Sequence, residues 1–205
     1  MNNIKLLKKR ELWVPTLWGW ILIVSALCLT AVLYAGFIHS FLAVSKPVRG
    51  EILVVEGWIP LFALERAASE FKGHGYGLLV LTGETHGWAV SVLKNAGINE
   101  DRIAVVSDKQ VQKDRTYSSA IALKEWLLAS HASGRKIDVL TLGAHARRSL
   151  LLYETALGDG FSVGIIAADN TRYDANQWWR STEGIRSVVE ETLAYIYTRL
   201  FLIVT

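Results

Sequence analysis

The sequence predicts an α/β protein: a Rossmann-like, doubly wound, mostly parallel five-stranded sheet preceded by one N-terminal transmembrane helix. Two observations support this fold class. Residues 12–45 contain no Asp, Glu, Lys or Arg. From residue 51 onward, short apolar runs alternate with segments of helical periodicity. Apolar strands that are each followed by a helix are typical of a parallel sheet covered on both faces.

Residues 16–44 are predicted to form a transmembrane anchor. The apolar run is longer than the roughly 20 residues that a spanning helix needs. Trp13, Trp18 and Trp20 lie where interfacial aromatic residues are expected. A cleaved signal peptide is the competing interpretation, but its apolar region covers only about 7 to 15 residues. We therefore favour an uncleaved anchor.

The charges that flank the anchor predict its orientation. Residues 1–15 form a basic tail with Lys5, Lys8, Lys9 and Arg10 against Glu11, whereas only Lys46 and Arg49 follow the anchor closely. The positive-inside rule places this tail in the cytoplasm and the domain of residues 50–205 outside the cytoplasmic membrane.

The charge of the outer domain argues against nucleic acid as a partner. Of 22 basic and 19 acidic residues, the tail holds four and one, so 18 of each remain in the rest of the chain. A nucleic-acid-binding surface would show a basic excess. The single cysteine, Cys28, lies in the anchor, so the domain has no disulfide framework and no thiol nucleophile.

The elements of the domain are expected in strict alternation. Strands are predicted at 51–57, 76–84, 102–107, 136–145 and 161–170, and helices at 60–75, 86–97, 114–134, 146–158 and from about 176 to the end. Pro60 stands at a permitted helix start, and Gly97 and Gly134 are expected helix stops. The apolar residues 193–205 are expected to pack on the core rather than on a membrane surface.

Polar residues that follow the strands are the candidates for a site, because ligands bind at the carboxyl edge of open parallel sheets. They are Glu56-Gly57, Thr82-Gly83-Glu84, Ser107-Asp108, His145 and Asp169-Asn170. If the strand order is 3-2-1-4-5, strands one and four are neighbours, and Glu56 lies close to His145.

The segment TLGAHARRS, residues 141–149, contains the strongest signal. His145 and Arg148 are three apart and share one face of a predicted helix start. A cation is unfavourable there unless something negative is bound, which predicts an anionic, phosphorylated ligand held by Arg148, with Ser149 nearby. The alternative is a structural ion pair of Arg148 with Glu56 or Glu84, and both interpretations remain open.

Other candidate residues have a structural and a functional interpretation. Asp114 or Thr116 is expected to cap a helix, while Arg115 and Thr116 are also candidates for ligand binding. One of Trp178 and Trp179 is expected to pack on the domain, and the other is a candidate stacking platform. The sequence has no G-x-G-x-x-G or Walker loop and no metal-ligand spacing, so no metal is predicted and any cofactor is unknown.

The motifs resemble the ElyC/SanA/YdcF family of bacterial envelope proteins, a domain without an established activity. The matching positions are Gly57, Thr82-Gly83, Thr116 and His145 to Arg148, with DRTYSSA upstream, and the resemblance covers about residues 50–200. Glu56 and Glu84 depart from it, because the family often has glycine there. The resemblance implies a role in peptidoglycan or surface-polysaccharide integrity.

Together with what this resemblance implies, the sequence predicts a single-pass envelope protein that binds a phosphorylated intermediate such as a lipid-linked sugar precursor. If bonds are broken, His145 with Glu56 or Glu84 is the expected acid/base set. Two alternatives remain open: a non-catalytic scaffold for an envelope partner protein, and a site for a nucleotide or S-adenosylmethionine-type ligand, which rests on fold analogy only.

Overall fold

The computed structural model describes residues 13–107, 114–130 and 135–202. The chain divides into two compact units, Met1–Gly36 and Phe37–Thr205. The predicted basic tail (up to residue 12), the Asp108 candidate and the Gly134 helix stop lie outside the described residues.

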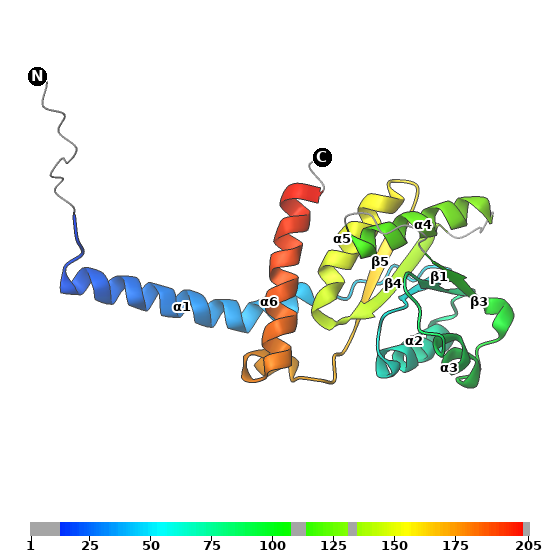
Figure 1. Cartoon of the computed structure of the whole chain (residues 1–205), viewed down its shortest axis with the longest axis horizontal. Helices are drawn as coiled ribbons and strands as arrows, with labels where there is room; N and C mark the ends of the chain where they lie inside the picture. Colours follow the sequence, from blue (N-terminus) through cyan, green and yellow to red (C-terminus); the bar gives the residue numbers. More distant parts are fainter. Residues whose placement is uncertain (1–12, 108–113, 131–134, 203–205) are drawn as a thin grey trace, which may run out of the picture. The chain divides into compact units, whose positions relative to one another are not determined.

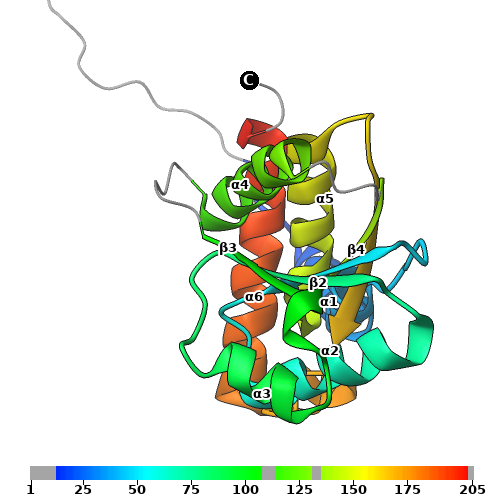
Figure 2. The same ribbon diagram turned by 90° about the vertical axis from the view of Figure 1, so that its right-hand side faces the viewer.

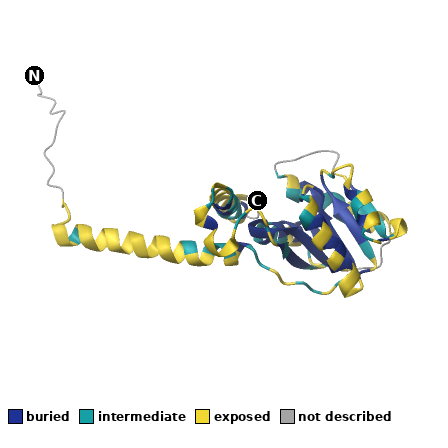
Figure 3. Ribbon diagram, turned by 90° about the horizontal axis from the view of Figure 1, so that it is seen from below, coloured by how far each residue is buried: buried dark blue, intermediate teal, exposed yellow. Residues whose placement is uncertain are grey.

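The first helix, α1 (Leu17–Leu42), is long and apolar enough to cross a membrane, although a signal sequence near the N-terminus passes the same test. Its residues are almost all exposed, in contrast to the strands of the domain (Figure 3). The last residues of α1, from Phe37 on, belong to the unit that contains the α/β domain, and there Leu42 is fully buried.

The domain contains one five-stranded sheet with the order β3-β2-β1-β4-β5, in which all strands are parallel. The strands are β1 (Ile52–Glu56), β2 (Leu78–Thr82), β3 (Ile103–Val106), β4 (Lys136–Leu142) and β5 (Ser162–Ala168). This is the predicted doubly wound class and the order that makes β1 and β4 neighbours. Each predicted strand is present; β1 and β2 end at their own polar candidates, Glu56 and Thr82, and the other three strands end one to three residues before theirs.

Helices cover both faces of the sheet (Figures 1 and 2). One face carries α2 (Leu61–His74) and α3 (Ala89–Asn95), and the other carries α4 (Arg115–Ala129) and α5 (Ala146–Leu157). The helix α6 (Thr182–Tyr197) contacts α5, and the π-helical turn η4 (Thr198–Leu202) continues it. Short 3-10 segments lie at Glu100–Arg102 (η1), Gly143–His145 (η2) and Ala175–Arg180 (η3).

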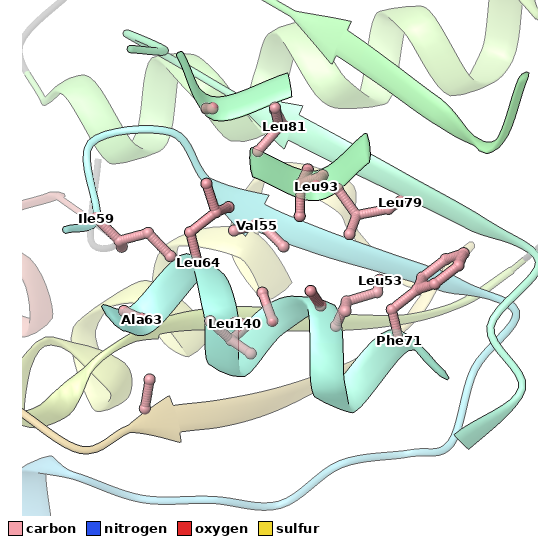
Figure 4. Packing of buried hydrophobic residues seen from close by; sticks show 14 of the residues in the cluster. Leu53, Val55, Ile59, Ala63, Leu64, Phe71, Leu79, Leu81, Leu93 and Leu140 are labelled. Atoms are coloured by element: carbon pink, nitrogen blue, oxygen red, sulfur yellow. The ribbon is translucent and has the colours of Figure 1, made fainter. Parts of the chain in front are cut away.

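Two hydrophobic cores result from the alternation of side chains along the strands. In β1, Leu53 and Val55 face α2 and α3, whereas Ile52 and Val54 face α4 and α5. Figure 4 shows the first of these clusters, with Leu64 of α2 directed toward the strands. Strands that are apolar on both faces explain the continuous runs in the sequence.

Side-chain caps decide where two of the helices begin. The Asp114 carboxylate accepts a hydrogen bond from the backbone N–H of Tyr117 at 3.1 Å, which starts α4 and confirms the predicted cap. The Ser181 hydroxyl accepts one from Gly184 N–H at 3.0 Å and starts α6. The predicted single helix from residue 176 is therefore divided into η3 and α6.

Asp138 joins the segment after α1 to the sheet. This fully buried carboxylate on β4 accepts hydrogen bonds from the backbone of Val48 and Gly50 and from the Tyr76 hydroxyl, at 2.7, 3.0 and 2.9 Å. Burial, then the hydrogen bond to Asp138, raises the pKa of Tyr76. Gly164 on β5 leaves room for this carboxylate, because a Cβ there would overlap Asp138 Oδ1.

The expectation that residues 193–205 pack on the core is wrong for the apolar residues that the structure describes. Leu193, Ile196, Tyr197, Leu200 and Phe201 are exposed. Within this segment Thr198 is buried, on the same side of the helix as Val188, which is buried earlier in α6. The large apolar side chains lie on the opposite side of the helix, since the packing against α5 fixes its rotation.

Candidate functional site

The candidate site is a cavity of about 600 Å³ at the carboxyl edge of the sheet, next to the β1–β4 switch point. Its lining comes from the ends of β1 and β2, the start of α4, η2, α5 and α6. The lining residues are Glu56, Trp58, Thr82, Gly83, Glu84, Asp114, Arg115, Thr116, Ser119, His145, Arg148, Arg186, Glu190 and Glu191. Most of the predicted site residues are thus brought together.

Glu56 is the last residue of β1, and only 3% of it is exposed. Three donors satisfy its carboxylate: Trp58 Nε1 at 3.1 Å, Ser149 Oγ at 3.0 Å and the Thr141 hydroxyl. Donors from three segments compensate for the cost of burying a carboxylate. The predicted Ser149 therefore supports Glu56 and does not line the cavity.

His145 occupies η2, at the turn between β4 and α5, and is buried. Its Nδ1 lies 2.7 Å from Glu191 Oε1. Its Nε2 faces the cavity, 3.4 Å from the Thr116 hydroxyl and 3.6 Å from Glu56 Oε2. The ring of Trp58 meets the imidazole edge-on at 5.1 Å between centroids. The predicted proximity of Glu56 and His145 is confirmed.

Glu191 of α6 fixes the tautomer of this histidine. Burial raises the pKa of the Glu191 carboxyl, but hydrogen bonds and the charges of His145 and Arg148 outweigh it and lower the pKa to about 2. Arg148 Nη2 lies 3.1 Å from His145 Nδ1, but Glu191 Oε1 is the closer partner at 2.7 Å, and an ionised carboxylate can only accept, so His145 Nδ1 donates its proton to Glu191. In the neutral form of this imidazole, Nε2 is then the nitrogen that can accept a proton at the cavity.

Arg148 is held by carboxylates on two helices. Its Nε donates to Glu191 Oε2 at 2.9 Å, its Nη2 lies 3.3 Å from Oε1, and its Nη1 donates to Asp114 Oδ2 at 3.0 Å. Burial lowers the pKa of Arg148, but Glu191, Asp114 and Glu56 together raise it above its ordinary value. Arg148 therefore forms a structural ion pair, which was the alternative to a bound phosphate. Its partners are Glu191 and Asp114 in place of Glu56 or Glu84.

Arg115 is the arginine of the cavity with the weakest partner. It lies at the start of α4, and its only carboxylate neighbour in the described chain is Glu84 at 3.9 Å, with both side chains largely exposed. Arg186 pairs with Glu190 at 3.0 Å. The lining contains five carboxylates and three arginines, so carboxylates are in excess.

Thr82 and the predicted glycines shape the cavity wall. The Thr82 hydroxyl is buried and hydrogen-bonded to Tyr153 at 2.9 Å. Gly83 has φ +75°, and a Cβ there would lie 2.7 Å from Ser119 Oγ, so the close approach of β2 to α4 requires glycine. Gly57 donates its backbone N–H to Thr82 O at 2.8 Å and does not line the cavity.

Asn170 is not part of this cavity. It lines a separate cavity of about 390 Å³ together with Gly143 and Tyr173. Its side-chain oxygen accepts the backbone N–H of Arg172 at 3.1 Å. Trp178 is buried, as expected for one of the tryptophans, and Trp179 is half-exposed; neither lines the cavity at His145.

Sequence reasoning missed Glu191, which contacts both His145 and Arg148. The available signal was the pair Glu190-Glu191 in VVEETLAYIY, an acidic pair in an otherwise apolar segment. It also missed that the Asp114 carboxylate, which caps α4, accepts a hydrogen bond from Arg148 as well. Among the described residues, no group of three or more His, Cys, Asp or Glu side chains is placed to hold a metal ion.

Fold and site together define a Rossmann-like α/β domain with a polar cavity built around a His–Glu pair. The sequence matches no protein-family model and no curated protein.

Proposed function

We propose that this chain is a membrane-anchored hydrolase in which His145 acts as general base. The observation that carries the proposal is the orientation of the imidazole: Nδ1 donates to Glu191 at 2.7 Å, and Nε2 faces the cavity. A histidine whose far nitrogen is fixed by a carboxylate presents one nitrogen for proton transfer, as in the triads of many hydrolases.

The reaction we propose is the hydrolysis of a phosphoester or glycosyl phosphate. His145 Nε2 removes a proton from the attacking water, whose oxygen bonds to phosphorus while the bond to the leaving oxygen breaks. The imidazolium then returns the proton to the leaving oxygen. Glu56, with Oε2 3.6 Å from Nε2, stabilises the imidazolium electrostatically. The Thr116 hydroxyl, at 3.4 Å from Nε2, positions the water.

Although carboxylates are in excess in the cavity lining, one position in the cavity suits a phosphate and the rim suits a sugar. Arg148 already donates its hydrogen bonds to Glu191 and Asp114. The groups that bind the phosphate are therefore Arg115 and the free N–H groups at the start of α4. The exposed carboxylates of Glu84 and Glu190 at the rim are suited to accept hydrogen bonds from sugar hydroxyls.

The cellular part of the proposal is an envelope role. Support comes from the apolar helix α1, from the basic residues that precede it, and from the resemblance to the ElyC/SanA/YdcF family at Gly57, Thr82-Gly83, Thr116 and His145 to Arg148. We propose that the N-terminus lies in the cytoplasm and that the domain lies outside the cytoplasmic membrane. A strain that carries His145→Ala at normal protein level is then expected to show an envelope defect, and an unchanged envelope contradicts this role.

The activity is tested with the full chain in detergent. The substrates are p-nitrophenyl phosphate, a hexose 1-phosphate and a polyprenyl-phosphate-linked sugar. We expect His145→Gln to lower kcat by about 10² or more and Glu191→Gln by about tenfold or more. The matched control is His74→Gln, on α2, where this histidine also pairs with a glutamate, Glu70, at 2.8 Å.

Equal rates for His145→Gln and the His74→Gln control would show that His145 is not the base. If the wild-type chain cleaves none of the substrates, the ion-paired network is structural, and the scaffold interpretation takes precedence.

A further inference from the structure

The side of α6 and η4 that faces away from the domain carries large apolar side chains, which are interrupted near its start by the Arg186–Glu190 ion pair and are continuous from Leu193 to Phe201. Seven large side chains on it are between 38% and 63% exposed: Ile185, Val189, Leu193, Ile196, Tyr197, Leu200 and Phe201. Their spacing of three and four residues places them on one side of the helix. A continuous exposed apolar face of this kind marks an interaction surface.

The two sides of α6 differ in their contacts and in their polarity. The inward side brings Glu191 to the cavity at His145 and buries Val188. The outward side is bordered by the Arg186–Glu190 ion pair near its start. From Thr192 onward the sequence contains one charged residue, Arg199. The outward side therefore becomes more apolar, and weakly basic, toward its end.

This helix lies at the point where the apolar segment of α1 enters the domain. The ring of Phe41, in the last turn of α1, contacts the ring of Tyr195 edge-on at 5.6 Å between centroids. The guanidinium of Arg147 lies 3.9 Å from the centroid of the Phe41 ring, and its Nε donates to the Phe41 carbonyl. Leu42, the next residue, is fully buried. These contacts fix the end of α1 against the domain, beside α6.

We propose that the outward side of α6 and η4 lies in the headgroup–acyl boundary of the membrane that holds α1. The inference rests on the membrane anchoring proposed above, but not on hydrolysis. A surface-lying helix combines a polar side that faces protein or water with an apolar side of Leu, Ile and aromatic residues. Tyr197 and Arg199 are residue types that favour the interface, and the positive charge favours anionic headgroups.

This arrangement has a consequence for the cavity at His145, because α6 contributes residues to it. Because Glu191 lines the cavity from the inward side of the helix whose outward side is proposed to contact the bilayer, this placement brings the cavity at His145 close to the lipid surface. A substrate with a lipid tail reaches such a cavity by diffusion within the membrane.

The test uses the full chain with Cys28→Ala, which removes the single cysteine. A single Leu193→Cys is labelled with an environment-sensitive fluorophore, and the protein is reconstituted in vesicles of phosphatidylethanolamine and phosphatidylglycerol. The matched control is Leu128→Cys on α4, because Leu128 and Leu193 are both 63% exposed.

We expect the label at residue 193, but not that at residue 128, to shift to shorter wavelength and to be quenched about twofold or more by brominated lipid. Equal behaviour of the two labels, with both in water, overturns the inference. A shift at residue 193 without lipid quenching, which disappears as the lipid-to-protein ratio rises, overturns it in favour of a second copy of this chain.

The same vesicles separate this inference from the anchoring on which it rests. The Leu128→Cys protein is washed with alkaline carbonate and sedimented. Release of the protein shows that α1 does not anchor the chain. This result overturns both the proposed anchoring and the inference about α6. Retention of the protein together with a water-exposed label at residue 193 overturns the α6 inference alone.

Discussion

The replacement Glu191→Gln tests the ion-paired centre of the cavity through its dependence on pH. The Glu191 carboxyl has an ordinary pKa of 4.5, and in the folded chain its pKa is lowered to about 2. This difference corresponds to about 3 kcal/mol of stability. Because the folded pKa is the lower one, the stabilisation is present above pH 4.5 and is lost as the pH falls toward 2.

We expect the difference in the free energy of unfolding between the wild-type chain and Glu191→Gln to become smaller as the pH falls. Between pH 5 and pH 3, the free energy of unfolding of the wild-type chain, relative to Glu191→Gln, falls by about 2 kcal/mol. The assay is urea unfolding of the full chain in a neutral detergent, followed by far-UV circular dichroism. The range lies below the ordinary pKa of histidine, so the ordinary titration of histidine side chains contributes little to the slope.

The adjacent glutamate supplies the control. Glu190 is 64% exposed at its side chain and pairs with the exposed Arg186, so Glu190→Gln is expected to change the stability by less than about 1 kcal/mol at any pH in this range. A wild-type advantage over Glu191→Gln that is constant between pH 5 and pH 3 would refute the ion pair with His145 and Arg148.

Three further substitutions test the frame that positions the site, each by urea unfolding at neutral pH. Asp138→Ala leaves the buried Tyr76 hydroxyl and the part-buried N–H groups of Val48 and Gly50 without their acceptor and is expected to destabilise the domain by about 3 kcal/mol or more; a loss below about 1 kcal/mol would contradict this role. Gly164→Ala places a Cβ onto Asp138 Oδ1 and 2.5 Å from Val48 N, and a loss of about 1 to 3 kcal/mol is expected. Gly73→Ala, on α2 with nothing within 4 Å of the added Cβ, is expected to stabilise by about 0.5 to 1 kcal/mol, and a loss of stability there would show that the packing argument is wrong.

The sequence predicted the fold class for physical reasons that are local, and it predicted the proximity of Glu56 and His145 only on condition of the strand order 3-2-1-4-5. Apolar runs on both faces of a strand require helices on both sides, and connections between parallel strands are right-handed. With the order 3-2-1-4-5, the residues that follow β1 and β4 meet at one edge. The 3.6 Å between His145 Nε2 and Glu56 Oε2 follows from that order.

The sequence did not reveal what neutralises Arg148. A cation in the first turn of a helix requires a negative partner, and the sequence offered a bound phosphate, Glu56 or Glu84 for this role. The partner in the structure is Glu191, 43 residues further along the chain. Burial of Glu56 under Trp58, Thr141 and Ser149 and exposure of Glu84 depend on packing that no local pattern encodes.

Hydrophobic periodicity and chain chirality act locally, so the apolar helix, the alternation of strands and helices and most residues at the edge of the sheet could be predicted from the sequence. The packing of distant helices determines which of two adjacent glutamates pairs with His145 and Arg148. Glu190 and Glu191 point about 100° apart on α6. The docking of α6 against α5 turns Glu191 toward His145, leaves Glu190 in solvent, and leaves the large apolar side chains of α6 facing outward.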